Sequence, residues 1–245
     1  MQFASIRRFN SLAYARRLLV VILGLFLCSV GIVCTYRSGL GLGPWDVLHK
    51  GVSLHTPLTF GQASILTGAV VILVGLMIKI RPGIATILNM LLIGVFIDLQ
   101  LRSNWLPDLS TTQWPLRLFV DVFGVFLMGL GTAFYITPRL GAGPRDGLML
   151  RLHILIGMRI SIVRATIELT ALTIGFFLGG PVGLGTLIFA FGIGPSVEIG
   201  FWLIKKYLPA LAPSPSTVPP PHAHTSVSDL APHHPASHPV DQHLS

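Results

Sequence analysis

Residues 41–48 of the chain read Gly-Leu-Gly-Pro-Trp-Asp-Val-Leu, and residues 141–148 read Gly-Ala-Gly-Pro-Arg-Asp-Gly-Leu. The second copy follows the first at a spacing of 100 residues. Compared without a gap, residues 17–50 and 117–150 are identical at 13 of 34 positions. Shared apolar composition raises such a count, but it does not produce a matched Gly-x-Gly-Pro-x-Asp-x-Leu element in both copies. The sequence therefore contains a duplicated unit.

Around the two elements the chain is strongly apolar. Of its 245 residues, 52% are hydrophobic and 11% are charged, and the mean hydropathy is +0.74. A soluble domain has about 25% charged residues, so this chain has too little polar surface for a water-soluble globule. The net charge of +8 does not indicate nucleic-acid binding, because the basic residues lie between apolar blocks and not in one patch. The composition predicts an integral membrane protein that contacts the lipid bilayer.

Six apolar stretches are long enough to cross a membrane as helices. A helix that spans a hydrocarbon core of about 30 Å needs roughly 20 mostly apolar residues. The stretches are Leu18–Tyr36, Phe60–Ile78, Gly83–Leu101, Leu116–Thr137, Ile160–Gly179 and Pro181–Ile204. Membrane β-strands would instead alternate apolar and polar residues. The predicted fold class is an all-α membrane protein with six transmembrane helices.

The duplication divides these spans into two sets of three. We expect a basic N-terminus at residues 1–16, a first repeat at 17–106, a second repeat at 107–206 and a Pro/His-rich tail at 207–245. Because three is odd, the second repeat must enter the bilayer from the side opposite to the first. The sequence thus predicts two inverted three-helix repeats, each with a short interfacial or re-entrant helix. Many secondary transporters are built in this way.

Charge and composition outside the spans predict the orientation of the chain. With the N-terminus in the cytoplasm, twelve loop lysines and arginines lie on the cytoplasmic side and four on the other. Such a bias is typical of cytoplasmic loops, so we expect both termini to be cytoplasmic. The tail contains six of the nine histidines. Its composition favours a disordered segment over a weak metal-binding one, because no histidine spacing indicates one coordination geometry.

Each Gly-Pro-x-Asp element predicts the start of a short helix. Its glycines permit close backbone approach, its proline suits the first helical position, and its aspartate lies in the first turn near free amide groups. The residues are Gly41, Gly43, Pro44, Asp46, Gly141, Gly143, Pro144 and Asp146. A helix of about ten to twelve residues covers about 15–18 Å, too little to cross. The elements either line a central path as re-entrant helices or are interfacial connectors with the aspartates as caps.

These elements, the paired Gly-Thr-containing third spans and the chain length resemble the YczE/YyaS/YitT family of bacterial integral membrane proteins, and most closely its YczE branch. The resemblance covers roughly residues 15–206 and excludes the tail. It implies a multi-pass protein of the bacterial plasma membrane. It implies nothing about the substrate.

Ionisable residues within spans are candidates for function. Arg164 and Glu168 lie four residues apart in the fifth span, so they can pair on one helix face. The pair either lines a path or is a structural ion pair that holds helices in register. Asp98 and Glu198 occupy equivalent positions of the two repeats. Either they line the path as well, or Asp98 is only a local interfacial partner of Arg102.

These features favour a permease or secondary transporter for a small solute or lipid-like molecule. The alternative is a non-transporting accessory or assembly subunit, bound to a membrane partner or to further copies of itself. An intramembrane enzyme is the least favoured, because the sequence lacks the motifs of a hydrolase, a metalloprotease or a phosphate-binding loop. The sequence predicts no cofactor or metal site.

Overall fold

The computed structural model describes residues 11–141 and 143–208. The chain divides into two units, Met1–Ala212 and Pro213–Ser245, and every described residue belongs to the first. The tail predicted at 207–245 lies almost wholly outside the described residues, as does most of the basic N-terminus predicted at 1–16.

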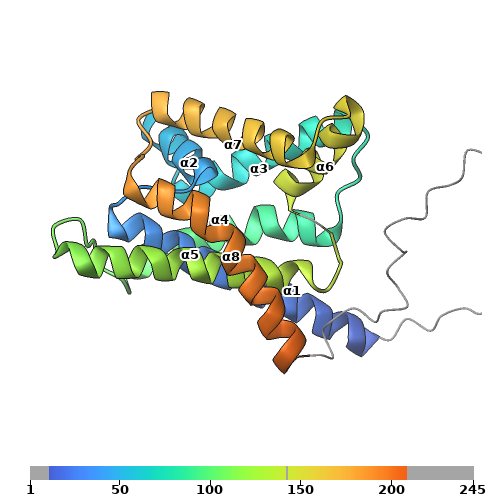
Figure 1. Ribbon diagram of the computed structural model, residues 1–245, viewed down its shortest axis with the longest axis horizontal. Coiled ribbons are helices and arrows are strands. Elements are labelled where there is room, and N and C mark those ends of the chain that lie inside the picture. The colour runs from blue at the N-terminus through green and yellow to red at the C-terminus, as the bar shows by residue number, and fades with distance from the viewer. Residues whose placement is uncertain (1–10, 142, 209–245) are drawn as a thin grey trace, which may run out of the picture. The chain divides into compact units, whose positions relative to one another are not determined.

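All regular elements in the described part of the chain are α-helices (Figure 1). Their bounds are α1 Ser11–Ser38, α2 Pro44–His55, α3 Phe60–Met77, α4 Ile84–Ser103, α5 Trp114–Ile136, α6 Pro144–Ile156, α7 Ile160–Phe177 and α8 Leu184–Tyr207. Six of them are long and apolar enough to cross a membrane, and α2 and α6 are the short exceptions. The prediction of an all-helical membrane protein with six such helices is confirmed.

Helices α1 and α5 cross in close contact at glycines. A Cβ atom on Gly31 would lie 2.4 Å from the carbonyl oxygen of Gly124, and one on Gly124 would lie 2.8 Å from that of Gly31. Gly24 and Gly131 approach each other in the same way. Small residues at a crossing let two membrane helices pack backbone to backbone. These glycines, which the duplication matches in sequence, therefore join the two copies.

The loop before each short helix holds the start of a long helix from the other copy. The amide of Gly185 in α8 donates to the carbonyl oxygen of Leu40 at 2.8 Å, and the amide of Ala85 in α4 donates to that of Leu140 at 3.2 Å. Leu140 is the counterpart of Leu40 in the duplication, and Ala85 is the counterpart of Gly185. The two contacts are therefore equivalent, with the roles of the copies exchanged. Glycines permit this approach, because Gly41 and Gly141 have φ values of +118° and +139° and pack against Gly183 and Gly83.

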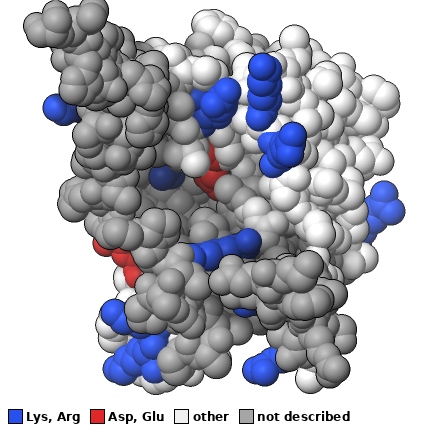
Figure 2. All heavy atoms as spheres, turned by 90° about the vertical axis from the view of Figure 1, so that its right-hand side faces the viewer, with Lys and Arg blue, Asp and Glu red and all other residues white. Residues whose placement is uncertain are grey.

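The chain segments between helices gather at two ends of the bundle. The N-terminal end of α1, the α3–α4 and α6–α7 turns and the C-terminal end of α8 lie at one end, on the right of Figure 1. We call this the basic end, because Lys and Arg side chains gather there (Figure 2). Its basic residues include Arg16, Arg17, Lys79, Arg81, Arg159, Lys205 and Lys206. The α4–α5 loop and the α7–α8 turn lie at the opposite end.

Candidate functional site

The Gly-Pro-x-Asp elements begin two short helices, as the sequence predicts. Pro44 and Pro144 occupy the first helical positions of α2 and α6, and Gly43 and Gly143 are the N-caps. The helices have 12 and 13 residues, or about 18–20 Å at 1.5 Å per residue. Helix α2 packs against α3 and α7, and α6 packs against α3, α7 and α4. Both short helices are therefore built into the bundle.

The N-terminal turns of the two short helices meet. The guanidinium carbon of Arg145 lies 4.8 Å from the centre of the Trp45 ring. These residues are equivalent in the duplication, so the contact joins corresponding points of the two copies. A cation–π contact contributes about 0.5–2 kcal/mol, depending on its exposure. The sequence shows both residues, but it gives no signal that they touch.

A small cavity lies where the two helices meet. Its volume is about 20 Å³, which is enough to hold a water molecule. Helices α2, α3, α4 and α6 supply its walls, and the lining includes Trp45, His49, Ser64, Thr67, Gly68, Asn89, Met90, Pro144 and Arg145. We call it the central cavity. It is polar on several sides although it lies between apolar spans, a combination typical of a functional path in a membrane protein.

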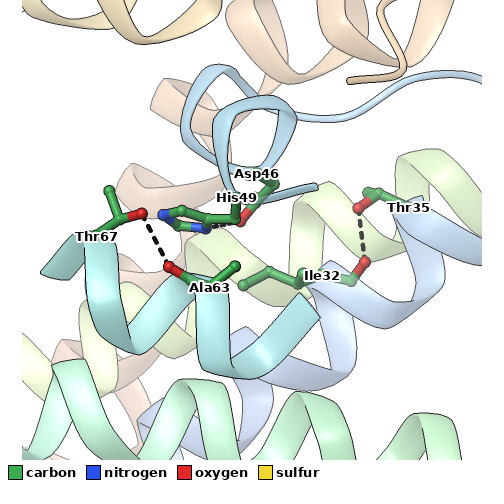
Figure 3. Close-up of polar contacts among 6 residues, drawn as sticks. All are labelled: Ile32, Thr35, Asp46, His49, Ala63 and Thr67. Atoms are coloured by element: carbon green, nitrogen blue, oxygen red, sulfur yellow. Dashed lines mark hydrogen bonds and ion pairs between the residues drawn. The ribbon is translucent and has the colours of Figure 1, made fainter. Parts of the chain in front are cut away.

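Asp46 is buried beside a histidine of its own helix. Asp46 and His49 are 2% and 1% exposed, and His49 Nδ1 lies 3.4 Å from Asp46 Oδ1 (Figure 3). Among the described residues neither of these two atoms has a hydrogen-bond partner. The hydroxyl of Thr35 lies on the neighbouring helix α1 and donates to Ile32 O at 2.9 Å. Within the described part of the chain, the ion-pair partner of this aspartate is thus an imidazole alone.

Asp146, the counterpart of Asp46, has a different environment. Its Oδ2 accepts a hydrogen bond of 3.0 Å from the hydroxyl of Tyr135. Position 149, which corresponds to His49, is Met149. Five residues of α2 are buried, whereas no residue of α6 is. The duplicated aspartates therefore have similar positions but different partners and a different degree of burial.

Asp98 and Glu198 also differ. Asp98 accepts hydrogen bonds from the hydroxyl of Thr59 and, at 2.9 Å, from the amide of Gly61. It therefore caps the start of α3 from the neighbouring helix α4 and contacts this helix start instead of Arg102. Glu198 is exposed on α8, and it hydrogen-bonds to none of the residues that the structure describes.

Arg164 and Glu168 form the ion pair that their spacing predicts. Arg164 Nε lies 2.9 Å from Glu168 Oε1, and the side chains are 53% and 33% exposed. They lie on the surface of α7 and do not line the central cavity. The equivalent positions of the first copy are Ser64 and Gly68, which do line it. Whether the pair takes part in function stays a prediction.

A larger cavity lies at the end of the bundle opposite the basic end. Its volume is about 310 Å³, the lower limit of ligand-binding pockets. Its lining includes Tyr36, Arg37, Lys50, Leu54 and Asp108. Lys50 Nζ lies 5.0 Å from the centre of the Tyr36 ring, and a hydrogen bond from the Ser110 amide lowers the pKa of Asp108. Two basic side chains and one acidic side chain line this cavity. No pattern in the sequence indicates it.

Comparison with known proteins assigns the chain to a family. The family of unknown function DUF6198 matches residues 15–200. An uncharacterized protein of Haemophilus influenzae is 36% identical over 187 residues, which cover 76% of this chain and 84% of that protein. No solved structure matches the chain.

Two proteins of Bacillus subtilis are also similar. The uncharacterized membrane protein YczE is 36% identical over 202 residues, which cover 78% of this chain and 92% of YczE. The uncharacterized protein YyaS is 28% identical over 192 residues, which cover 76% of this chain and 90% of YyaS. These matches confirm the resemblance that the Gly-Pro-x-Asp elements indicate. The chain is therefore a membrane protein that belongs to the family of unknown function DUF6198.

Proposed function

We propose that this protein is a secondary transporter of a small solute or lipid-like molecule, and that it works by exchange of two inverted three-helix halves. The halves are residues 17–106 and 107–206. The paired contacts of Leu40 with Gly185 and of Leu140 with Ala85 support this proposal, because equivalent residues of the two halves exchange roles in them. Three spans in each half would orient the halves oppositely in the bilayer.

The observation that carries the proposal is the unequal packing of equivalent helices. Helix α3 packs along α4, where a Cβ atom on Gly94 would lie 2.5 Å from the carbonyl oxygen of Gly61. Helix α7 makes no comparable contact with α8, and a Cβ atom on Gly194 would meet no atom within 4 Å. Because the sequences of the halves correspond, a second conformation with α7 on α8 and α3 away from α4 has similar contacts to offer.

The short helices are also unequally packed, because α2 lies closer to α7 than α6 lies to α3. A Cβ atom on Gly175 of α7 would lie 2.5 Å from the amide nitrogen of Leu48 in α2. A Cβ atom on the equivalent Gly75 of α3 would lie 3.4 Å from Ile80 Cδ1. Its three nearest atoms all belong to Ile80, and none belongs to α6. One end of the bundle is thus tightly packed and the other is looser. Alternating access requires such an inequality, together with the means to reverse it.

The distribution of Lys and Arg supports one orientation of the protein in the membrane. The positive-inside tendency supports a cytoplasmic location for the basic end in a bacterial plasma membrane, with both termini on that side. The looser packing of α6 and of α7 with α8 is then on the cytoplasmic side, and the 310 Å³ cavity faces outward. The central cavity lies between, and we assign the substrate path to it.

The exposed ion pair gains a role in this proposal. Arg164 and Glu168 correspond to Ser64 and Gly68, which line the central cavity. In the reversed conformation, α7 would take the place of α3, and the pair would face the path. At these two positions the path would then present uncharged residues in one conformation and an ion pair in the other.

Cysteine accessibility tests the proposal without a known substrate. In a Cys28→Ala/Cys34→Ala background, Met90→Cys places a thiol in the wall of the central cavity. A membrane-impermeant thiol reagent should label it both in intact cells and in inverted vesicles, because the site opens alternately to both sides. The matched control is Leu91→Cys, the next residue of α4, whose side chain is 40% exposed on the outer surface and should face lipid.

Labelling of Met90→Cys from both sides, with Leu91→Cys unlabelled, would support alternating access. Labelling of Met90→Cys from one side only, or from neither, would contradict it.

A non-transporting membrane subunit is the second candidate. The observation in its favour is the exposure of the Arg164–Glu168 pair, since charges at membrane depth normally face protein or water. A partner or a second copy that covers α7 would meet this need. A stoichiometric complex in mild detergent that is lost in Arg164→Leu/Glu168→Leu, together with one-sided labelling of Met90→Cys, would support this function. We propose no catalytic role.

A further inference from the structure

The Asp46–His49 pair is a buried ionisable group whose facing atoms lack partners. His49 Nδ1 and Asp46 Oδ1 are 3.4 Å apart, and among the described residues neither atom has a hydrogen-bond partner. Two buried lone pairs that face each other are unfavourable. A hydrogen on Nδ1 would turn the imidazole into a donor to the carboxylate. The neutral imidazole meets this need as its Nδ1–H tautomer, and one added proton then gives an imidazolium that still donates to the carboxylate.

The second half lacks such a pair. There, Tyr135 donates a hydrogen bond to Asp146 at 3.0 Å, and Met149 replaces the imidazole. The residue equivalent to Tyr135 is Thr35, whose hydroxyl donates to Ile32 O of its own helix (Figure 3). Among the described residues, only the first half thus combines a buried carboxylate with an imidazole at the short helix.

The charged and titratable groups around the pair are few. Arg145 of α6 and the thiol of Cys28 of α1 interact electrostatically with it. Helices α3 and α4 contribute only uncharged polar groups to the shared cavity, namely Ser64, Thr67 and Asn89. The ionisable residues of α7, Arg164 and Glu168, are partly exposed and paired with each other. On α2 itself, Lys50 lies over the Tyr36 ring.

We propose that the Asp46–His49 pair is a proton-binding site, and that a proton bound there is the coupling ion of the transporter. This inference rests on the proposed function. The proton is taken up by the imidazole, and the resulting imidazolium is stabilised by the carboxylate of Asp46. Nothing else in the pair changes covalently, so the site returns to its first state when the proton leaves.

Arg145 links this proton to the contact between the halves. Arg145 stacks on Trp45, and both residues line the central cavity together with His49. A protonated His49 repels the guanidinium, so proton binding weakens the contact that joins the N-terminal turns of α2 and α6. By linkage, separation of the two turns must in return favour proton binding. The proton thus shifts the balance between the two packing arrangements.

Trp45 provides the readout. It lies four residues before His49, so the two share a face of α2, and a charge beside an indole ring alters its fluorescence. The variant Trp105→Phe/Trp114→Phe/Trp202→Phe leaves Trp45 as the single tryptophan. In this full-length protein, purified in detergent or in liposomes, Trp45 emission is followed across the range in which imidazoles and carboxylates titrate. We expect one reversible sigmoidal transition.

Three further variants in this background identify the titrating group. His49→Met introduces the residue that the second half carries at the equivalent position, and Asp46→Asn removes the carboxylate charge. His49→Met should abolish the transition, and Asp46→Asn should move it to lower pH because the imidazolium loses its counter-charge. The control is His55→Gln, since His55 is exposed at the other end of α2 and its loss should leave the transition unchanged.

The possible results separate this inference from the proposed function. A transition that survives in His49→Met, or the lack of any transition in the parent protein, would overturn the proton site. If His49→Met fails to fold, the Asp46→Asn shift decides, and an unshifted transition overturns the proposal. A transition that depends on His49 together with one-sided labelling of Met90→Cys would leave the proton site intact and contradict transport.

Discussion

Helices α2 and α6 begin with the same Gly-Pro-x-Asp element, yet they lie in different surroundings. Helix α2 buries five residues, holds Asp46 against His49 and packs closely on Gly175 of α7. Helix α6 has no buried residue, and its aspartate is bound by Tyr135. The difference extends to the long helices, because α3 packs on α4 and α7 does not pack on α8 in the same way. A duplicated sequence has thus produced two unequally packed halves, and the inequality is what a reversible transporter would use.

The largest expected effect comes from the contact that both halves share. Gly31→Leu should prevent folding, because even a Cβ atom there would lie 2.4 Å from the carbonyl oxygen of Gly124. Forcing a large side chain into a backbone–backbone contact should cost about 3 kcal/mol or more. The measurement is the yield of monodisperse protein after size-exclusion chromatography. Normal yield and thermal stability would show that α1 and α5 do not cross as described.

The next effect contrasts equivalent glycines of the two halves. Gly94→Leu should lower the free energy of unfolding by about 2 kcal/mol, because its side chain would meet the backbone of Gly61. Gly194→Leu should change it by less than about 0.5 kcal/mol, because the position is open. Thermal unfolding in one detergent compares the two directly. Equal destabilisation would mean that α7 and α8 are packed as closely as α3 and α4.

A smaller effect is expected at the acidic residues of the third spans. Asp98→Asn should destabilise the protein by about 1–2 kcal/mol, because the carboxylate caps α3 through Thr59 and Gly61. Glu198→Gln should have almost no effect on thermal unfolding. If Glu198→Gln were the more harmful change, Glu198 would have to cap the start of α7 in the way that Asp98 caps the start of α3.

The smallest effect is expected at the contact between the two short helices. Arg145→Gln should cost about 0.5–1 kcal/mol and change Trp45 emission in the single-tryptophan protein, because the guanidinium lies over the ring. The control in the same background is Lys206→Gln, because the Lys206 ammonium lies over the Tyr207 ring at the end of α8, and its loss should leave Trp45 emission unchanged. Unaltered Trp45 emission in Arg145→Gln would contradict the meeting of α2 and α6.

Part of the asymmetry has a signal in the sequence. Thr59, which forms a capping box with Gln62 at the start of α3, corresponds to Arg159, and Gly61 corresponds to Ser161. Pro195 lies inside α8, where α4 has Val95. A proline within a helix removes a backbone hydrogen bond and favours a kink. These differences lie where the packing of the halves diverges, but the sequence alone does not show which half is the tighter.

The sequence by itself determined the six long helices, the two short ones and the correspondence between the copies. These features depend on local quantities: apolar length, helix-starting residues and residue-by-residue identity at a spacing of 100. Their bounds were less well predicted at α1, which begins at Ser11 and not at Leu18, because a helix can continue past the apolar segment. Local chemistry also fixed the Arg164–Glu168 pair, whose partners lie one turn apart.

Only the tertiary structure decided which of these residues meet. The contact of Trp45 with Arg145, the bond of Asp98 to the start of α3 and the exposure of Glu198 all depend on the distance between helices. That distance is set by side chains from several helices at once, so two similar sequences can pack differently. The duplicated aspartates could be identified from the pattern of residues, and the imidazole beside Asp46 comes from the same helix. The burial of this pair and the phenol beside Asp146 required the packed chain.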